Sequence, residues 1–155
     1  IIRAGKTAGS LMSGYLEGSN VDIAQEFSEL QEDEVLVFMG HGTTHYANSI
    51  YAALDYTFKD LGYKNIFLGT VEAYPSMQSL LRMVREYGPK KVILAPFMIV
   101  AGDHARNDLA GDTPESWLCQ FQKCGFEVVP VLKGLGQYPA VRQIFINHIR
   151  EALDH

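Results

Sequence analysis

The sequence predicts an α/β fold, a three-layer sandwich in which a four-stranded parallel sheet is flanked by helices. From Glu34 onward, short apolar runs alternate with segments of helical periodicity, which is typical of parallel sheets covered by helices. The connections are short, and proline and glycine stand where helices are expected to begin and end. At 155 residues, the chain is long enough for one domain with a substantial core.

Four strands are expected, each a short run rich in β-branched and aliphatic residues. The run from Val35 to Met39 is continuously apolar, as expected of a parallel strand that is buried on both faces. The other three strands are predicted at Asn65 to Thr70, Lys91 to Val100 and Glu127 to Leu132.

Four helices are expected to alternate with these strands, over Ala47 to Leu61, Pro75 to Tyr87, Pro114 to Cys124 and Pro139 to Leu153. A proline opens three of them, where its missing N–H costs nothing. A glycine follows three of them, where a left-handed residue ends a helix. The prolines are Pro75, Pro114 and Pro139, and the glycines are Gly62, Gly88 and Gly125.

Residues 1–33 differ from the rest, because four glycines are spread through weakly periodic sequence. We expect an irregular lead-in here, with one helix over Val21 to Leu30. The chain is thus divided into this lead-in and an α/β domain, residues 34–155. Because the chain opens at Ile1 rather than at Met, we expect that an upstream portion has been removed.

Composition and charge exclude several classes of partner. The formal net charge is −5, and no basic run or aromatic–basic interleaving is present, so no nucleic-acid partner is expected. No apolar stretch approaches the roughly 20 residues of a membrane span, and neither a signal peptide nor a lipidation motif is visible. Cys119 and Cys124 are expected to be reduced thiols, which indicates the cytoplasm; a signal peptide upstream would indicate the periplasm.

Side chains capable of chemistry follow three of the predicted strands. His41 follows the first strand between Gly40 and Gly42, which permit a tight turn with close backbone approach. Glu72 follows the second strand and His104 the third. Right-handed crossovers bring the carboxyl ends of parallel strands to one edge, where ligands bind in open α/β sheets. Two imidazoles and one carboxylate suit an exchangeable first-row divalent metal, and they could equally accept protons at neutral pH.

Each of these residues also has an ordinary structural interpretation when it is taken singly. His41 could be a hydrogen-bonded turn residue, Glu72 could cap the helix that follows it, and His104 could belong to a polar loop or to a first helical turn. The polar segment from Ala101 to Pro114 is typical either of a binding-site wall or of a solvated connection. The shared position of the three residues at strand ends favours the functional interpretation.

Common cofactor and hydrolase motifs are missing from the sequence. The Gly134-Leu135-Gly136 segment lacks the spacing of a dinucleotide fingerprint, and Gly40-His41-Gly42 is not followed by the Gly-Lys-Ser/Thr of a P-loop. No serine nucleophile elbow is present. No organic cofactor is therefore expected.

Four blocks of sequence carry a family resemblance: Phe38 to Gly42, Val71 to Pro75, Ala95 to Asp108 and Gly134 to Gly136. Together they resemble the anaerobic-type sirohydrochlorin cobaltochelatases, the CbiK family of class II chelatases, which are related in fold to ferrochelatase. The resemblance runs from about Val35 to the end of the chain. The family enzyme has two similar α/β halves with the macrocycle in the cleft between them, and this chain resembles the C-terminal half.

The resemblance implies insertion of Co²⁺, the substrate metal, into sirohydrochlorin on the route to cobalamin. It also implies that His41, Glu72 and His104 form the metal site. We expect His41 and His104 to act in catalysis, one of them accepting a pyrrole proton. The implied partners are the tetrapyrrole and the missing N-terminal half, and a homo-oligomer is left open. The alternatives are an iron or nickel chelatase of the same fold, or a non-catalytic metal- or haem-binding protein.

Overall fold

The computed structural model describes residues 30–153 and has the predicted α/β architecture. Within these residues, four strands form one all-parallel sheet: β1 (Glu34–Gly40), β2 (Ile66–Thr70), β3 (Lys91–Pro96) and β4 (Glu127–Pro130). The order across the sheet is β2-β1-β3-β4, so β1 lies between β2 and β3. The predicted four-stranded parallel sheet is confirmed.

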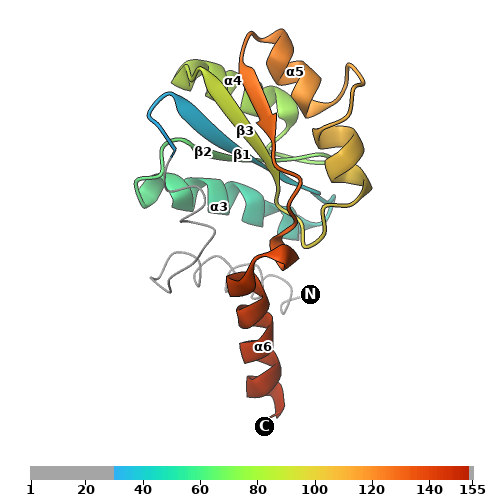
Figure 1. Ribbon diagram of the computed structural model, residues 1–155. Helices are drawn as coiled ribbons and strands as arrows, with labels where there is room; N and C mark the ends of the chain where they lie inside the picture. The colour runs from blue at the N-terminus through green and yellow to red at the C-terminus, as the bar shows by residue number, and fades with distance from the viewer. Residues whose placement is uncertain (1–29, 154–155) are drawn as a thin grey trace.

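Helices cover both faces of the sheet, which gives the three layers (Figure 1). α3 (Ser49–Asp60) lies on one face, directly after the short 3₁₀ turn η1 (Tyr46–Asn48). α4 (Met77–Tyr87) and α5 (Trp117–Lys123) lie on the other face together with a π-helix, η2 (His104–Leu109). The predicted three-layer sandwich is therefore confirmed.

The central strand β1 divides the core into two clusters. Successive side chains of a strand point to opposite faces of the sheet, so residues of β1 alternate between the helical layers. Val35, Val37 and Met39 pack with α4 and α5, whereas Leu36 and Phe38 pack with α3. All five side chains are buried. Burial on both faces explains why this strand is continuously apolar.

β3 is shorter than its apolar run predicted, because it ends at Pro96. Beyond that point the chain pairs with residues 134–136 instead, where the Leu135 N–H donates to the Met98 carbonyl at 2.8 Å. A β-carbon on Gly134 would lie 2.6 Å from the Ile99 carbonyl oxygen, so glycine permits this close approach. Residues 134–136 thus fix the course of the chain after β3.

Two of the three helices expected to open with proline begin later. α4 begins at Met77, where the hydroxyl of Ser76 accepts a hydrogen bond from a free N–H of the first turn. α5 begins at Trp117 and is capped by Ser116 in the same way. Each serine hydroxyl accepts a hydrogen bond from an N–H that has no partner within the helix. This capping hydrogen bond favours a helix start directly after the serine rather than at the proline.

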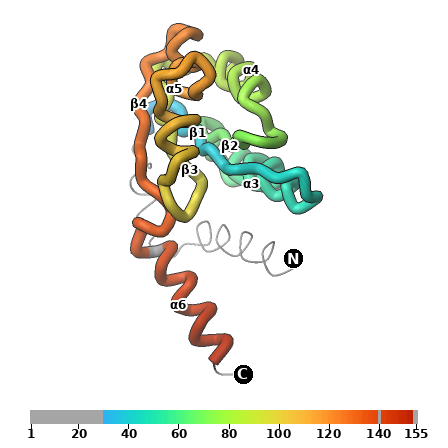
Figure 2. The backbone as a smooth tube through the Cα atoms, turned by 90° about the vertical axis from the view of Figure 1, so that its right-hand side faces the viewer, coloured from blue at the N-terminus to red at the C-terminus, as the bar shows by residue number. Residues whose placement is uncertain are grey.

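α6 (Pro139–Leu153) begins at its proline as predicted, directly after the 3₁₀ turn η3 (Leu135–Gln137). It leaves the sheet rather than covering it, as two views at right angles show (Figures 1 and 2). The glycines expected after helices have positive φ angles, from 76° to 92° at Gly62, Gly88 and Gly125.

The helix expected over Val21 to Leu30 lies outside the described residues, apart from Leu30 itself. The division of the chain at residue 34 into a lead-in and an α/β domain stays a prediction. Cys119 and Cys124 are free thiols, as expected. None of the helices in the described part of the chain is long and apolar enough to cross a bilayer.

Candidate metal site

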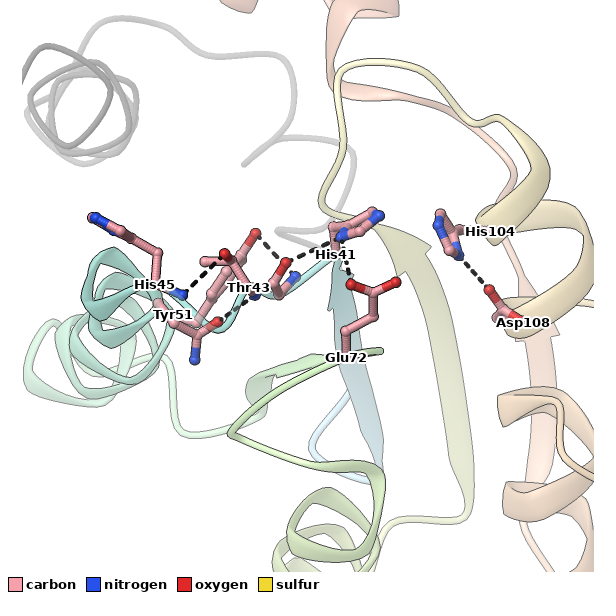
Figure 3. A network of polar contacts seen from close by, with 9 residues as sticks. His41, Thr43, His45, Tyr51, Glu72, His104 and Asp108 are labelled. Atoms are coloured by element: carbon pink, nitrogen blue, oxygen red, sulfur yellow. Dashed lines mark hydrogen bonds and ion pairs between the residues drawn. The ribbon is translucent and has the colours of Figure 1, made fainter. Parts of the chain in front are cut away.

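The three predicted site residues meet at the carboxyl edge of the sheet (Figure 3). His41 directly follows β1, Glu72 comes two residues after β2, and His104 opens η2, eight residues after β3. Because β1 lies between β2 and β3, the loops of both neighbours reach the His41 loop. Each of the three side chains offers one ligand atom, and these atoms all lie within 4.8 Å of one another.

Backbone hydrogen bonds continue the pairing of β1 with β2 beyond the ends of the strands. The Val71 N–H donates to the Gly40 carbonyl, and the Glu72 N–H donates to the His41 carbonyl, each at 3.0 Å. The Glu72 carboxylate is thereby held beside the imidazole, with Oε2 3.6 Å from His41 Nδ1. Glu72 does not cap α4, since Ser76 has that position. The capping interpretation is therefore wrong.

Two glycines let the His41 loop pack tightly, as the sequence predicted. Gly42 has a φ of +86°, and a β-carbon there would lie only 2.9 Å from the β-carbon of Thr70. A β-carbon on Gly40 would overlap the ring of Tyr51 in α3. A larger residue at either position would therefore push the loop away from its neighbours.

Both imidazoles have their Nδ1 beside an oxygen atom. His41 Nδ1 lies 3.0 Å from the carbonyl oxygen of Gly42, and His104 Nδ1 lies 2.5 Å from Oδ2 of Asp108. In the neutral ring that donates Nδ1–H to such an oxygen, the lone pair is on Nε2, where a metal can bind. The two rings are nearly perpendicular, at 86°, and their centroids are 4.5 Å apart.

The three side chains are open to solvent, with exposed fractions of 46% for His41, 54% for Glu72 and 38% for His104. An ion held by them therefore keeps coordination positions for other ligands. Bonds of about 2.1 Å to a tetrahedral ion place ligand atoms about 3.4 Å apart, so the three atoms, which lie within 4.8 Å of one another, would draw closer to hold an ion. Two imidazole nitrogens and one carboxylate oxygen suit divalent first-row metals.

The sequence does not predict that Asp108 contacts His104. In the sequence, Asp108 is one of several polar residues in the segment Ala101 to Pro114, whose pattern predicts a loop. That segment contains η2, so the four-residue spacing places Asp108 one turn after His104 on the same side of a helix. The sequence shows this spacing and allows a first helical turn at His104, but it does not predict the π-helix over His104–Leu109.

Asn48 is a second missed residue, and it ties together the loops that follow β1 and β2. Its side-chain oxygen accepts a hydrogen bond from the Thr43 N–H at 3.0 Å. Its side-chain nitrogen donates to the Tyr74 carbonyl at 2.6 Å. The loops that carry His41 and Glu72 are therefore connected through one amide side chain.

An apolar pocket of about 310 Å³ lies on the α3 side of the sheet. Its lining includes Tyr51, Leu54, Phe97, Met98 and Leu135. Tyr51 connects the pocket to the site, because its hydroxyl lies 3.5 Å from the backbone nitrogen of Gly42.

Known proteins are similar in sequence to this chain over most of its length. A sequence model of the family described as cobalt chelatase (CbiK) matches residues 16–154. The sirohydrochlorin cobaltochelatase of Salmonella typhimurium strain LT2 is 40% identical over 132 residues, which cover 85% of this chain and 50% of that protein. The sirohydrochlorin cobaltochelatase CbiKC of Nitratidesulfovibrio vulgaris strain Hildenborough is 36% identical over 121 residues, which cover 78% and 43%. The chain thus spans about half the length of the curated relatives it matches. It belongs to the cobalt chelatase (CbiK) family, which confirms the resemblance seen in its sequence.

Proposed function

We propose that this chain is the metal-binding half of a sirohydrochlorin cobaltochelatase, an enzyme that inserts Co²⁺ into sirohydrochlorin in cobalamin biosynthesis. One observation carries the proposal: His41, Glu72 and His104 place three ligand atoms within 4.8 Å of one another at an open edge of the sheet. Membership of the cobalt chelatase family and the names of both relatives support the choice of metal and tetrapyrrole.

Metal insertion exchanges one dication for two pyrrole protons, so the site must hold Co²⁺ and also release it. Two imidazoles and one carboxylate form a more exchangeable ligand set than four thiolates do. His41 and His104 hold the incoming ion through Nε2, and Glu72 supplies an oxygen ligand and a balancing negative charge. As the ion passes to the ring, an imidazole that is no longer a ligand accepts one of the two pyrrole protons, and the other leaves to solvent, to which this site is open.

The remaining contacts with the macrocycle come from a second half of the protein, because both relatives are about twice as long as their aligned parts. Tyr51, Phe97 and Met98 line the apolar pocket, and they are the residues of this chain that would contact one edge of the macrocycle. Residues 1–155 alone are expected to bind Co²⁺ and to insert it slowly. A cytoplasmic location stays a prediction, and a homo-oligomer stays open.

The experiment measures Co²⁺ insertion by the visible absorbance of sirohydrochlorin, under anaerobic conditions, with the full-length protein. His41→Ala, Glu72→Ala and His104→Ala should each reduce the rate to a small fraction of the wild-type rate. His45→Ala is the matched control. His45 lies in the same loop as His41, but its Nδ1 accepts the Ala47 N–H and caps η1.

Wild-type rates in His41→Ala, Glu72→Ala and His104→Ala would overturn the proposal. Tight Co²⁺ or haem binding without any insertion would favour the non-catalytic carrier instead. Competition between Co²⁺, Fe²⁺ and Ni²⁺ under reducing conditions identifies the preferred metal, since all three accept nitrogen and oxygen ligands.

A further inference from the structure

A carboxylate contacts the His104 ring on the side away from His41 and Glu72. Asp108 Oδ2 lies 2.5 Å from His104 Nδ1, and Figure 3 shows Asp108 on the far side of His104 from His41. Both side chains are partly exposed, at 38% for His104 and 43% for Asp108. Asp108 is thus outside the group of three ligand atoms, yet it contacts one of their rings directly.

The local helix brings the two side chains together. η2 is a π-helix, in which the Ala110 N–H reaches back five residues to the Ala105 carbonyl at 3.2 Å. Such turns are rare and are found frequently at functional sites. Asp108 is the fourth residue after His104, so their side chains lie on one side of this helix.

The hydrogen bond determines which ring nitrogen can bind a metal. An ionised carboxylate only accepts hydrogen bonds, so in a neutral imidazole that contacts it the shared proton belongs to Nδ1, and the lone pair is on Nε2. Without the carboxylate, a neutral imidazole can carry its proton on either nitrogen, and its ring can rotate. The other histidine needs no such side chain, because the Gly42 carbonyl oxygen lies 3.0 Å from His41 Nδ1.

We propose that Asp108 is a positioning residue for Co²⁺ binding: it fixes the His104 ring and its Nδ1–H form, so that Nε2 is the ligand atom. This proposal rests on the proposed function, since it assigns Asp108 a role in loading the same site. It extends the site from three residues to four, with one residue acting only through another. Partners of metal-binding histidines act in this way in many proteins, and their loss weakens metal binding about 10- to 100-fold.

The test compares Asp108→Asn and Asp108→Ala with Asp103→Asn in the full-length protein. Asp103 is the matched control, because it adjoins His104 and is exposed, and its side chain makes no capping hydrogen bond to η2. Co²⁺ titration should show affinities about 10- to 100-fold weaker for both Asp108 variants and unchanged for Asp103→Asn. Thermal unfolding of each variant reports whether it is folded.

The second readout is the nitrogen-15 NMR spectrum of the metal-free histidines, which distinguishes protonated from unprotonated ring nitrogens. His104 should be in the Nδ1–H form in the wild type and in Asp103→Asn. A mixture of both forms is expected in Asp108→Ala, a change that a merely structural role would not produce.

The two proposals fail in different ways. If the wild type binds Co²⁺, His104→Ala abolishes binding, and both Asp108 variants bind as the wild type does, the positioning proposal is overturned and the proposed function stands. A His104 tautomer that is the same in the wild type and in Asp108→Ala also overturns it. If the wild type binds no Co²⁺, the proposed function fails together with the positioning role that rests on it.

Discussion

Replacing Gly42 with alanine tests whether the candidate site depends on the close packing of the His41 loop. Gly42 has a φ of +86°, and a left-handed backbone costs other residues about 1–2 kcal/mol. The new β-carbon would lie 2.9 Å from the β-carbon of Thr70 and 3.0 Å from the nitrogen of Ala73. Overpacking of this kind costs about 1–3 kcal/mol. We therefore expect Gly42→Ala to lower the free energy of unfolding by about 2–5 kcal/mol. Co²⁺ binding should weaken as well, because the Gly42 carbonyl lies beside His41 Nδ1.

Gly88→Ala separates the packing cost from the backbone cost. Gly88 also has a positive φ, +76°, but no atom lies within 4 Å of the added β-carbon. This variant should lose only about 1–2 kcal/mol and keep its affinity for Co²⁺. Thermal unfolding followed by circular dichroism gives the comparison, because 1 kcal/mol shifts Tm by about 2–4 °C in a chain of this size. Equal losses of Tm in the two variants would refute the packing argument.

Two further predictions concern the connection between the loops and the opposite end of the sheet. Asn48→Ala should lower the free energy of unfolding by about 1–3 kcal/mol, because it removes two hydrogen bonds worth about 0.5–1.5 kcal/mol each, from Thr43 and to Tyr74. It should also weaken Co²⁺ binding, and an unchanged calorimetric affinity would show that the loops hold their places without Asn48. At the opposite end, a hydrogen bond from Lys91 holds the pKa of Glu34 below its ordinary value of 4.5. The folded state therefore binds fewer protons than the unfolded state as pH falls through this range, and stability is lost. Between pH 7 and pH 3, Tm should fall less in Glu34→Gln than in the wild type, and parallel curves would contradict this reasoning.

The sequence predicted the layers of this fold because the signals for them are local. Each strand and helix carries its own periodicity, and β1 shows burial on both faces in its composition alone. The end of β3 was not predictable in the same way, because it depends on pairing with residues 134–136, far along the chain. The course of α6 is a similar case. Its sequence predicts a helix, but not that this helix leaves the sheet.

The candidate site was predictable where the sheet topology alone places a residue. His41 and Glu72 come one and two residues after their strands, so the strand ends determine where they lie. His104 comes eight residues after β3, and its position depends on η2. A π-helix has no strong sequence signature, so the contact between His104 and Asp108 was visible only in the structure. The sequence thus predicts that His41, Glu72 and His104 lie together, but not that Asp108 contacts His104.

Anomalous diffraction at the cobalt absorption edge, from crystals soaked in Co²⁺, tests most directly whether the three strand-end residues form a metal site. We expect one strong anomalous peak about 2.1 Å from Nε2 of His41, from Nε2 of His104 and from a carboxylate oxygen of Glu72. The same measurement on His104→Ala crystals should show no peak there. A wild-type crystal with cobalt bound elsewhere, and none between these three side chains, would contradict the assignment.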